Sequence, residues 1–430
     1  MPSGGLPVHE RRCHPVLSRN SLKGDAMTNT LSDTTIHLVK ATVPALQEHG
    51  LAITRRMYER MFQNAEIRDL FNQSHHGETG SQPRALASAI LAYAQNIDNL
   101  GALAPAVERI AQKHVGLNIL PEHYPHVAEA LLGAIKDVLG DVATDEILAT
   151  WGEAYWFLAH VLIGREKAIY TSLASAPGGW NGWRNFRIES KQRESEIITS
   201  FVLRPEDGGP ILRHQPGQYL TFWIEVPDQH PLKRNYSISS APNGETYRIS
   251  VKREPQGVAS NWLHDQTEVG HVLKVAPPAG EFFLNEESPR PVVLLSGGVG
   301  LTPMMSMLET IAARHPNKVT YYVHGTLNGS THAMKARVRS LAEAYPNIKA
   351  ATFYVEPRPE DRPGEDYDHQ GLITVDWLQA NTPLEEAGYY LCGPRPFLRA
   401  FVGGLALAGV RSNRIHYEFF GPADEILTAA

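Results

Sequence analysis

His114 is the residue of this sequence whose surroundings most strongly suggest chemistry. It belongs to the stretch QKHVGL and shares one stripe of a predicted amphipathic helix with Val107, Ile110 and Ala111. The imidazole should therefore face inward, at the end of an apolar wall that Gly116 closes. An inward histidine is either a metal ligand or a core residue whose ring nitrogens are both hydrogen-bonded, and these residues alone leave both possibilities open.

Three further polar side chains are predicted to point into the same helical region. Tyr58 lies on the apolar stripe of its helix, and Gln82 comes one turn before a stripe that includes Leu86. Glu166 shares a face with aliphatic residues of the last predicted helix, where a carboxylate is costly to bury unless it accepts hydrogen bonds. Each of these residues is more often structural when taken singly, but together with His114 they outline a polar pocket.

Two other segments have the form of phosphate-binding turns. GVASNWL (257–263) places a glycine at a predicted helix start, and SGGVGLTP (296–303) lies between a buried strand and a helix. Backbone N–H groups at such turns bind phosphate together with the helix dipole. The second segment departs from the G-x-G-x-x-G fingerprint, because Pro303 takes the place of its third glycine. The cofactor-binding residues predicted from these two segments are Gly257, Val258, Ala259, Ser260, Gly298, Val299, Gly300, Leu301, Thr302 and Pro303.

The composition limits the class of protein. With 430 residues the chain exceeds what one hydrophobic core usually serves, so two or three domains are expected. A net charge of −6 argues against a nucleic-acid partner. Cys13 and Cys392 cannot alone form a disulfide framework or a zinc site, which favours a reducing cytoplasm. The apolar runs are shorter than the roughly 20 residues that span a bilayer. Residues 1–26 lack the apolar run of a secretory signal, so we expect a disordered extension, with Met27 as an alternative start.

Periodicity divides the rest of the chain into three regions. Alternating segments over 217–226 and 247–253 indicate a small antiparallel barrel. From about residue 290, a buried strand, a helix over 303–314 and a strand over 319–324 indicate a parallel α/β unit. The predicted fold class is therefore multidomain, with an all-α region, then an antiparallel β-barrel, then an α/β region with a parallel sheet. The predicted helices of the first region cover 34–48, 51–63, 83–98, 104–114, 121–139 and 144–172.

The sequence as a whole resembles a known family. Residues 30–173 resemble a bacterial globin, and the chain from there to residue 422 resembles a ferredoxin-reductase-like module. The combination is similar to the flavohaemoglobins, which are nitric oxide dioxygenases. The resemblance implies, after the extension over 1–26, a haem domain over 27–174, a linker over 175–182, an FAD-binding β-barrel over 183–288 and an NAD(P)-binding α/β domain over 289–430.

The resemblance gives specific roles to the polar residues of the helical region. QKH matches the family's proximal histidine, which makes His114 the haem-iron ligand, and MYERMF matches its distal tyrosine, Tyr58. Tyr124 in PEHY and Glu166 in GREKAIY match the pair that hydrogen-bonds the proximal imidazole in this family, which would push electron density onto the iron. Three further residues match haem-pocket positions of the family: Phe71 in FNQS, and Gln82 and Leu86 in SQPRAL.

Two residues depart from the family pattern. Met57 stands where the family often has an aromatic residue, and Pro83 directly follows Gln82, which predicts an extended backbone at Gln82 and a changed reach of its side chain. Lys113 lies outside the stripe of His114. It either tunes the haem and flavin potentials from the domain interface or is a solvated helix charge.

The reductase resemblance assigns the flavin and nicotinamide sites. RNYS (234–237) fits the R-x-Y-S flavin signature, with Arg234 for the pyrophosphate, Tyr236 against the isoalloxazine and Ser237 toward the N5 edge. Cys392, in YLCGPRPF, either contacts nicotinamide or is a packed structural thiol, and Glu418 is expected to assist electron transfer or nicotinamide geometry. The other expected cofactor contacts are Tyr219, Asn235, Gly393, Pro394, Phe419, Phe420, Gly421 and Pro422.

The resemblance implies an enzyme that converts nitric oxide and O2 to nitrate, with electrons passing from NAD(P)H through FAD to haem b. NADH versus NADPH stays open because no acidic residue clearly ends the strand over 319–324, although the family leans toward NADH. We expect a cytoplasmic monomer with no transmembrane segment, and a distal pocket apolar enough to admit a lipid. Two alternatives are a haem-based oxygen carrier or sensor, and a flavin reductase that serves an external electron acceptor.

Overall fold

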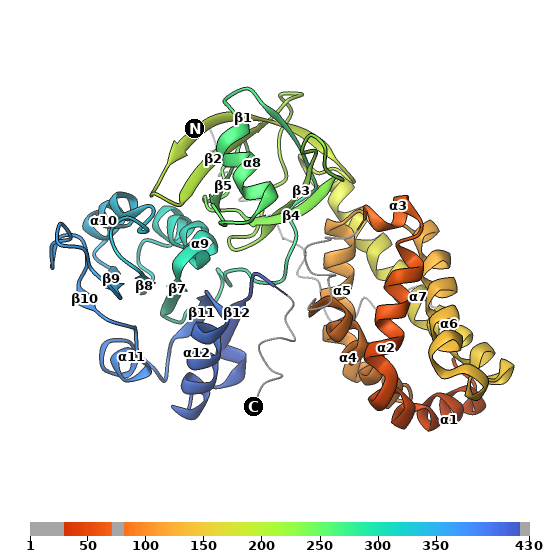
Figure 1. Cartoon of the computed structure of the whole chain (residues 1–430). Coiled ribbons are helices and arrows are strands. Elements are labelled where there is room, and N and C mark those ends of the chain that lie inside the picture. Colours follow the sequence, from red (N-terminus) through yellow and green to blue (C-terminus); the bar gives the residue numbers. More distant parts are fainter. Residues whose placement is uncertain (1–29, 71–80, 422–430) are drawn as a thin grey trace, which may run out of the picture.

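The computed structural model describes residues 30–70 and 81–421, and it confirms the predicted fold class (Figure 1). A helical unit is followed by an antiparallel barrel and then by an α/β unit with a parallel sheet. Two residues with predicted cofactor contacts, Phe71 and Pro422, lie outside the described residues. Within the described ranges, no helix combines the length and the apolar character needed to cross a bilayer.

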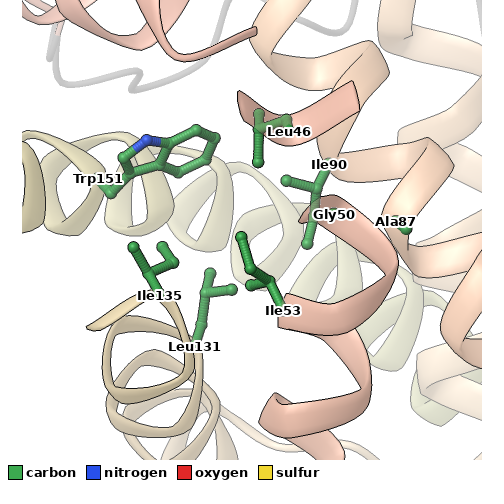
Figure 2. Close-up of a pocket in the computed structure, with 8 residues that line it drawn as sticks. All are labelled: Leu46, Gly50, Ile53, Ala87, Ile90, Leu131, Ile135 and Trp151. Carbon is green, nitrogen blue, oxygen red and sulfur yellow. The ribbon is translucent and has the colours of Figure 1, made fainter. Parts of the chain in front are cut away.

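The helical unit packs amphipathic helices around one apolar core. Side-chain caps set three of its helix starts: Ser32 accepts from the Thr35 N–H, Asn64 from the Glu66 N–H and Thr144 from the Ile147 N–H. The helices are α1 (Asp33–Ala41), α2 (Val43–Met61), α3 (Ala65–Arg68), α4 (Ser81–Gln95), α5 (Ala104–Gly116), α6 (Tyr124–Leu139) and α7 (Asp145–Ser175). A small apolar cavity remains where α2, α4, α6 and α7 meet (Figure 2), and it is lined by Leu46, Gly50, Ile53, Ala87, Ile90, Leu131, Ile135 and Trp151.

Two local predictions for this unit are wrong. The break predicted near Gly50 lies instead at Thr42, and α2 begins there with a proline in its first turn. Gly50 is a buried residue within α2, where a glycine costs only about 1 kcal/mol relative to alanine, and the packing of the buried face of α2 offsets that cost. Gln82 is also helical rather than extended, because Pro83 falls within the first turn of α4, where its missing N–H would have no intrahelical partner.

The barrel is a six-stranded antiparallel sheet in the order β4-β3-β6-β1-β2-β5. Alternate residues of its strands point into a separate core that includes Phe201, Phe222 and Tyr247, all with no exposed surface. α8 (Val258–Gln266) lies between β5 and β6 in the sequence. The strands are β1 (Arg184–Arg193), β2 (Ile198–Pro205), β3 (Tyr219–Ile224), β4 (Leu232–Ser237), β5 (Tyr247–Lys252) and β6 (Val272–Val275).

The α/β unit has a parallel sheet in the order β10-β9-β8-β7-β11-β12, with helices on both faces. Leu294 of β7 packs on the side of α9 and α10, whereas Leu295 packs on the side of α11 and α12. Because the chain leaves β7 in one direction and returns at β11 on its other side, the carboxyl ends of these two strands form the topological switch point. The elements are β7 (Val292–Gly297), α9 (Leu301–Arg314), β8 (Thr320–Thr326), α10 (Lys335–Ala344), β9 (Ile348–Tyr354), β10 (His369–Gln370), α11 (Val375–Asn381), β11 (Gly388–Cys392), α12 (Arg395–Leu407) and β12 (Ile415–Glu418).

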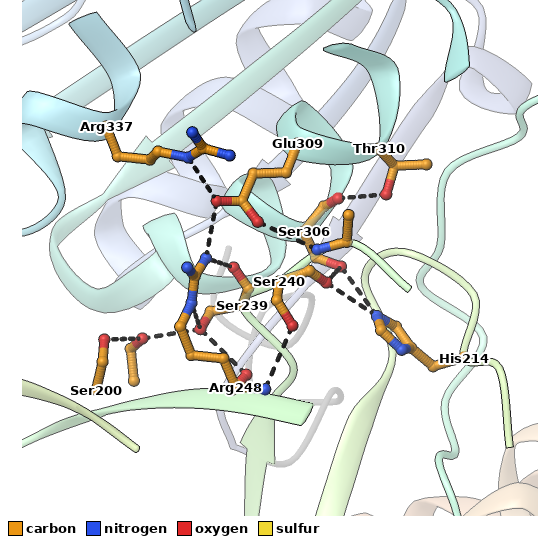
Figure 3. Close-up of polar contacts among 11 residues, drawn as sticks. Ser200, His214, Ser239, Ser240, Arg248, Ser306, Glu309, Thr310 and Arg337 are labelled. Carbon is orange, nitrogen blue, oxygen red and sulfur yellow. Dashed lines mark hydrogen bonds and ion pairs between the residues drawn. The ribbon is translucent and has the colours of Figure 1, made fainter. Parts of the chain in front are cut away.

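A polar network joins the barrel to the α/β unit (Figure 3). The Glu309 carboxylate on α9 is 2.9 Å from Arg337 Nε on α10 and 3.2 Å from Arg248 Nη2 on β5. The Ser306 hydroxyl, one turn earlier, donates to the carbonyl of Ser240 at 2.7 Å. Buried charged groups of this kind are retained only with several partners, so the network fixes the angle between these two units.

Candidate functional site

His114 lies in the last turn of α5, between the buried residues Ala111 and Val115. Its Nδ1 is 2.7 Å from Oε1 of Glu166 on α7 and 3.2 Å from the hydroxyl of Tyr124. That hydroxyl also donates to the same Glu166 oxygen at 2.6 Å. The structure therefore brings together three of the predicted residues: His114 near the end of α5, Tyr124 at the start of α6 and Glu166 within α7.

The hydrogen bonds fix which imidazole nitrogen is free. A carboxylate can only accept, so Nδ1 of His114 carries the proton and donates to Glu166, and Nε2 keeps its lone pair. The His114 side chain keeps 30% of its surface exposed whereas that of Glu166 keeps 3%, and no described residue hydrogen-bonds Nε2. An imidazole anchored through one nitrogen, with the other open, is the usual form of a histidine that ligates a metal, and this donor set fits a haem iron.

The buried carboxylate is only half satisfied. Oε1 of Glu166 accepts from His114 and Tyr124, whereas Oε2 is buried with no hydrogen-bond partner among the described residues. Burying a carboxylate oxygen without a partner lowers the stability of the fold. The arrangement is therefore kept because Oε1 accepts the imidazole proton of His114 and not because it stabilises the fold.

The other predicted residues of the helical unit lie on α2 and α4. Tyr58 is 7% exposed, and burial raises the pKa of its phenol above its usual value, so the hydroxyl keeps its proton at neutral pH. Its ring lies 5.4 Å from that of Phe62. Leu86 packs partly buried against the same core, and Gln82 is partly exposed in the first turn of α4. Tyr58 and Leu86 thus belong to the core that α2 and α4 share with α6 and α7.

In the barrel, the predicted flavin residues gather on β3 and β4. Ser237 pairs directly with Tyr219 across these strands, and Tyr236 packs edge-on against Phe222 at 5.6 Å between ring centroids. Arg234 is partly buried, with Nη1 donating to its neighbour's carbonyl at 2.8 Å, whereas Asn235 is exposed. A planar ligand would meet aromatic and hydroxyl groups from one continuous hairpin.

One contact at this hairpin was missed by sequence reasoning. The Tyr219 ring lies over Gly280, where an added Cβ would be 2.9 Å from its Cε1 and where φ is +110°. Only glycine suits both the space and the backbone. The signal was present in the PPAGE turn, but a glycine in a turn is too common to single out.

The first predicted phosphate turn precedes α8. Gly257 is the N-cap residue and Val258 begins the helix, with Ala259 buried behind it. The Ser260 hydroxyl accepts from the Glu254 N–H at 3.1 Å and donates to the Gly257 carbonyl at 3.2 Å. That hydroxyl therefore shapes the turn, and the backbone N–H groups of the first turn are the groups left for an anion.

The second predicted phosphate turn lies at the switch point of the parallel sheet. A short turn over Gly298–Gly300 connects β7 to α9, whose first residues Leu301, Thr302 and Pro303 are buried, and Val299 packs against the core below. Gly300 touches the end of β11: an added Cβ would lie 2.1 Å from the Cys392 carbonyl oxygen. Two strand ends thus meet without a side chain between them, which is the cradle that a dinucleotide pyrophosphate needs.

The end of β11 carries the predicted nicotinamide residues. Cys392 has no exposed surface, and burial raises the pKa of its thiol well above the usual value. Gly393 is held against the Phe397 ring, and Pro394 is the N-cap residue of α12. A buried, protonated thiol favours the packed structural role for Cys392 over a reactive one.

Glu418 ends β12 directly beside Cys392 in the sheet register. Burial raises the pKa of this carboxyl to about 7, the Lys113 charge acts in the opposite direction, and Glu281 adds to the rise. Lys113 belongs to α5, so a charge of the helical unit acts on the carboxyl at the end of the last strand of the α/β unit. Beyond β12, Phe419 lies under the Arg395 guanidinium and Gly421 lies against the Phe419 ring, whereas Phe420 is 47% exposed.

Family models match the three units in turn. A globin model matches residues 55–162, a model described as an oxidoreductase FAD-binding domain matches 185–284, and one described as an oxidoreductase NAD-binding domain matches 294–402. The three ranges fall in the helical unit, the barrel and the α/β unit in turn.

Curated relatives and solved structures match nearly the whole chain. A flavohemoprotein of Xylella fastidiosa is 56% identical over 403 residues, covering 94% of this chain and 100% of the relative, and one of Rhizobium meliloti is 46% identical over 399 residues, covering 91% and 98%. The structure is similar to a Malassezia yamatoensis flavohemoglobin solved with bound FAD and heme, with a TM-score of 0.81, 27% identity and coverage of 91% of this chain and 100% of that one. The FAD/NAD-binding domain of a Vibrio cholerae nitric oxide dioxygenase matches 56% of this chain and 100% of its own length at 38% identity, with a TM-score of 0.52.

The contact at Gly300 yields a testable prediction. Gly300→Ala should destabilise the α/β unit by about 3 kcal/mol and weaken nicotinamide-nucleotide binding, because backbone atoms of β11 cannot yield to the new methyl group. Urea-dependent hydrogen exchange of the β7 and β11 amides would measure the change. Gly403→Ala is the matched control, because Gly403 lies exposed on α12 with no atom within 4 Å of an added Cβ, and this change should stabilise slightly. Equal, small effects of both substitutions would contradict the close approach at Gly300.

Proposed function

Because this chain belongs to the flavohemoprotein family, we propose that it is an NAD(P)H- and O2-dependent dioxygenase that converts nitric oxide to nitrate. The reaction balances when two nitric oxide and two O2 molecules consume one NAD(P)H and release two nitrate ions, NAD(P)+ and a proton. We assign haem b to residues 27–174, FAD to residues 183–288 and NADH or NADPH to residues 289–430. When bound, FAD splits the hydride's electron pair into single electrons, and haem iron accepts them one at a time and activates O2.

The observation that carries this proposal is the anionic hydrogen bond on His114. Glu166 accepts the Nδ1 proton at 2.7 Å from a site that is 2% exposed, where a charge acts strongly. The imidazole thereby gains imidazolate character, and Nε2 becomes a stronger electron donor to any metal it binds. Tyr124 holds the same oxygen and so prevents the carboxylate from rotating away. A site built to push electrons suits oxygen activation better than reversible oxygen storage.

Tyr58 on α2 supplies a proton donor. Its buried phenol stays protonated, because burial raises its pKa, and it can donate a hydrogen bond to a partly negative oxygen ligand. Met57 and Leu86 belong to the same apolar core and would help to keep water from that bond. Tyr58 would thus hold the oxygen ligand in place while nitric oxide arrives.

The reductase units supply the electrons. Arg234 and the N–H groups at the start of α8 would hold the flavin pyrophosphate, Tyr236 and Tyr219 would pack on the ring system, and Ser237 would donate toward N5. The turn over Gly298–Gly300 would bind the nucleotide pyrophosphate beside the end of β11. This arrangement supports an oxidoreductase in which all three sites belong to one chain, and we propose that a monomer suffices.

Nitrate formation tests the proposed activity. Purified protein loaded with haem and FAD should consume nitric oxide, O2 and NADH in the ratio given above and form nitrate. His114→Ala should lose haem and nitrate formation while keeping NADH-driven flavin reduction, because the barrel and α/β unit have their own cores. His126→Ala, an exposed histidine on α6, should behave as the unsubstituted protein. If NADH reduces the flavin but no nitrate forms, the chain is instead a reductase for an external acceptor.

Glu166→Gln tests the electron push. Glutamine keeps the shape but accepts more weakly, so the haem midpoint potential should rise and the iron–histidine stretching frequency should fall in resonance Raman spectra. Glu153→Gln on the same helix, where the carboxylate accepts from Thr35 instead, should change neither quantity. Wild-type values of both quantities in Glu166→Gln would show that this carboxylate does not control the His114 ligand.

A further inference from the structure

Lys233 is a lysine buried at the junction between the barrel and the helical unit. It lies on β4, is 1% exposed, and donates from Nζ to the carbonyl of Leu117 at 2.9 Å. Leu117 is the C-cap residue of α5, three positions beyond His114. One side chain of the flavin hairpin thus holds the end of the helix that carries the proximal histidine.

The lysine is held by a cage rather than by an ion pair. Its Nζ lies 5.4 Å from the Trp183 ring centroid and 5.2 Å from that of Trp223, and the two indoles pack edge-on. No carboxylate of the described residues lies within ion-pair distance of it, although the charge of Asp69 acts on it from farther away. Two π faces and the negative end of α5 are therefore the main groups that favour the ammonium form.

Burying this charge is costly, which indicates a specific use. Burial lowers the pKa of Lys233 to about 7, so removal from water outweighs the attraction of Asp69. A methionine would fill the same space without that cost. The cost is accepted where a directed, charge-assisted bond to the last carbonyls of a helix fixes a position that packing alone leaves loose.

The neighbouring contacts show what is being fixed. Next to Leu117, Gly116 rests on the barrel so closely that an added Cβ would be 3.1 Å from the Thr221 hydroxyl and 3.9 Å from the Tyr219 ring. On the other strand of the same hairpin, Lys233 directly precedes Arg234. The end of the proximal helix and the flavin residues are thus separated by a few atoms of protein.

We propose that Lys233 is a positioning residue for electron transfer, clamping the C-terminal end of α5 to the flavin hairpin and so setting the place of His114 relative to the flavin. The inference rests on the proposed electron route but not on nitric oxide as the substrate. Without the clamp, the residues after His114 lose the bond from Lys233 on β4 to the Leu117 carbonyl, and the helix end moves on the barrel surface.

The test compares Lys233→Met with a matched lysine. Lys274 on β6 pairs with Trp223 in the sheet from the side opposite Lys233, but it is 46% exposed and bonds only Glu225 among the described residues. Lys274→Met removes a lysine charge from the strand position beside the same tryptophan without touching α5. Lys233→Arg keeps the charge and the donors, and Lys233→Gln keeps a donor without the charge.

Two readouts are measured on the haem- and FAD-loaded protein. The first is the anaerobic rate of flavin-to-haem electron transfer after NADH mixing, which Lys233→Met should slow by about tenfold, with flavin reduction by NADH unchanged. The second is hydrogen exchange of the Leu117 and Ile119 amides, which bond the carbonyls of Lys113 and His114 and should exchange faster. Lys233→Arg should restore much of the transfer rate and of the amide protection, and Lys233→Gln should restore less of each. Lys274→Met should match the unsubstituted protein in both readouts.

The results that would contradict the role of Lys233 differ from those that would contradict the proposed function. A wild-type transfer rate and wild-type exchange in Lys233→Met would remove the role of Lys233 while leaving the electron route intact. If Lys274→Met slows haem reduction as much as Lys233→Met does, the effect is one of general electrostatics. If Lys233→Met slows flavin reduction as much as haem reduction, the effect arises in the barrel. If Lys233→Met does not fold, Lys233→Gln decides by the same two readouts. Absence of haem reduction in the unsubstituted protein would instead overturn the proposed function itself.

Discussion

The hydrogen bond from His114 to Glu166 is the interaction on which the rest of the arrangement depends. A carboxylate that is 2% exposed needs a donor, and α7 can bring it to α5 only because His114 and Tyr124 both donate to Oε1. This fixes the imidazole's tautomer and leaves Nε2 open. Deleting either donor would remove one of the two hydrogen bonds on the buried Glu166 carboxylate, so the three residues form one unit whose purpose is electronic.

Two joints connect the helical unit to the reductase part of the chain: α5 meets the barrel at the first, and the barrel meets the α/β unit at the second. The end of α5 meets the barrel through Gly116 and the bond from Lys233 to the Leu117 carbonyl, whereas the barrel meets the α/β unit through the several partners of Glu309. Glu309 thus has more than one charged partner, whereas Lys233 bonds one backbone carbonyl at the end of α5, and another contact between the helical unit and the hairpin, from Arg68 to His230 at 3.3 Å, does not involve α5. The position of the proximal helix on the flavin hairpin is therefore the more sensitive of the two geometries.

Sequence patterns predicted the parts of the site that local rules determine. The inward face of His114 and Glu166 followed from helical periodicity, and the turn before α9 followed from glycines between a strand and a helix. Patterns failed where tertiary contacts override local preference. Gly50 stays helical because the buried face of α2 offsets the small cost of an interior glycine, and Pro83 is tolerated because it falls in a first turn, so neither residue ends or delays a helix as expected. Lys233 could not be found, because an alternating strand predicts a buried position but not that a lysine is buried there between two indoles.

The central claim is that the haem, flavin and nucleotide sites of one chain form a single electron path. Anaerobic stopped-flow mixing of NADH with the haem- and FAD-loaded protein, followed at flavin and haem wavelengths over a wide range of protein concentrations, tests it most directly. The account predicts that haem reduction follows flavin reduction with a first-order rate constant that is independent of protein concentration. Haem that stays ferric while the flavin is reduced, or a rate that rises in proportion to protein concentration, would contradict it.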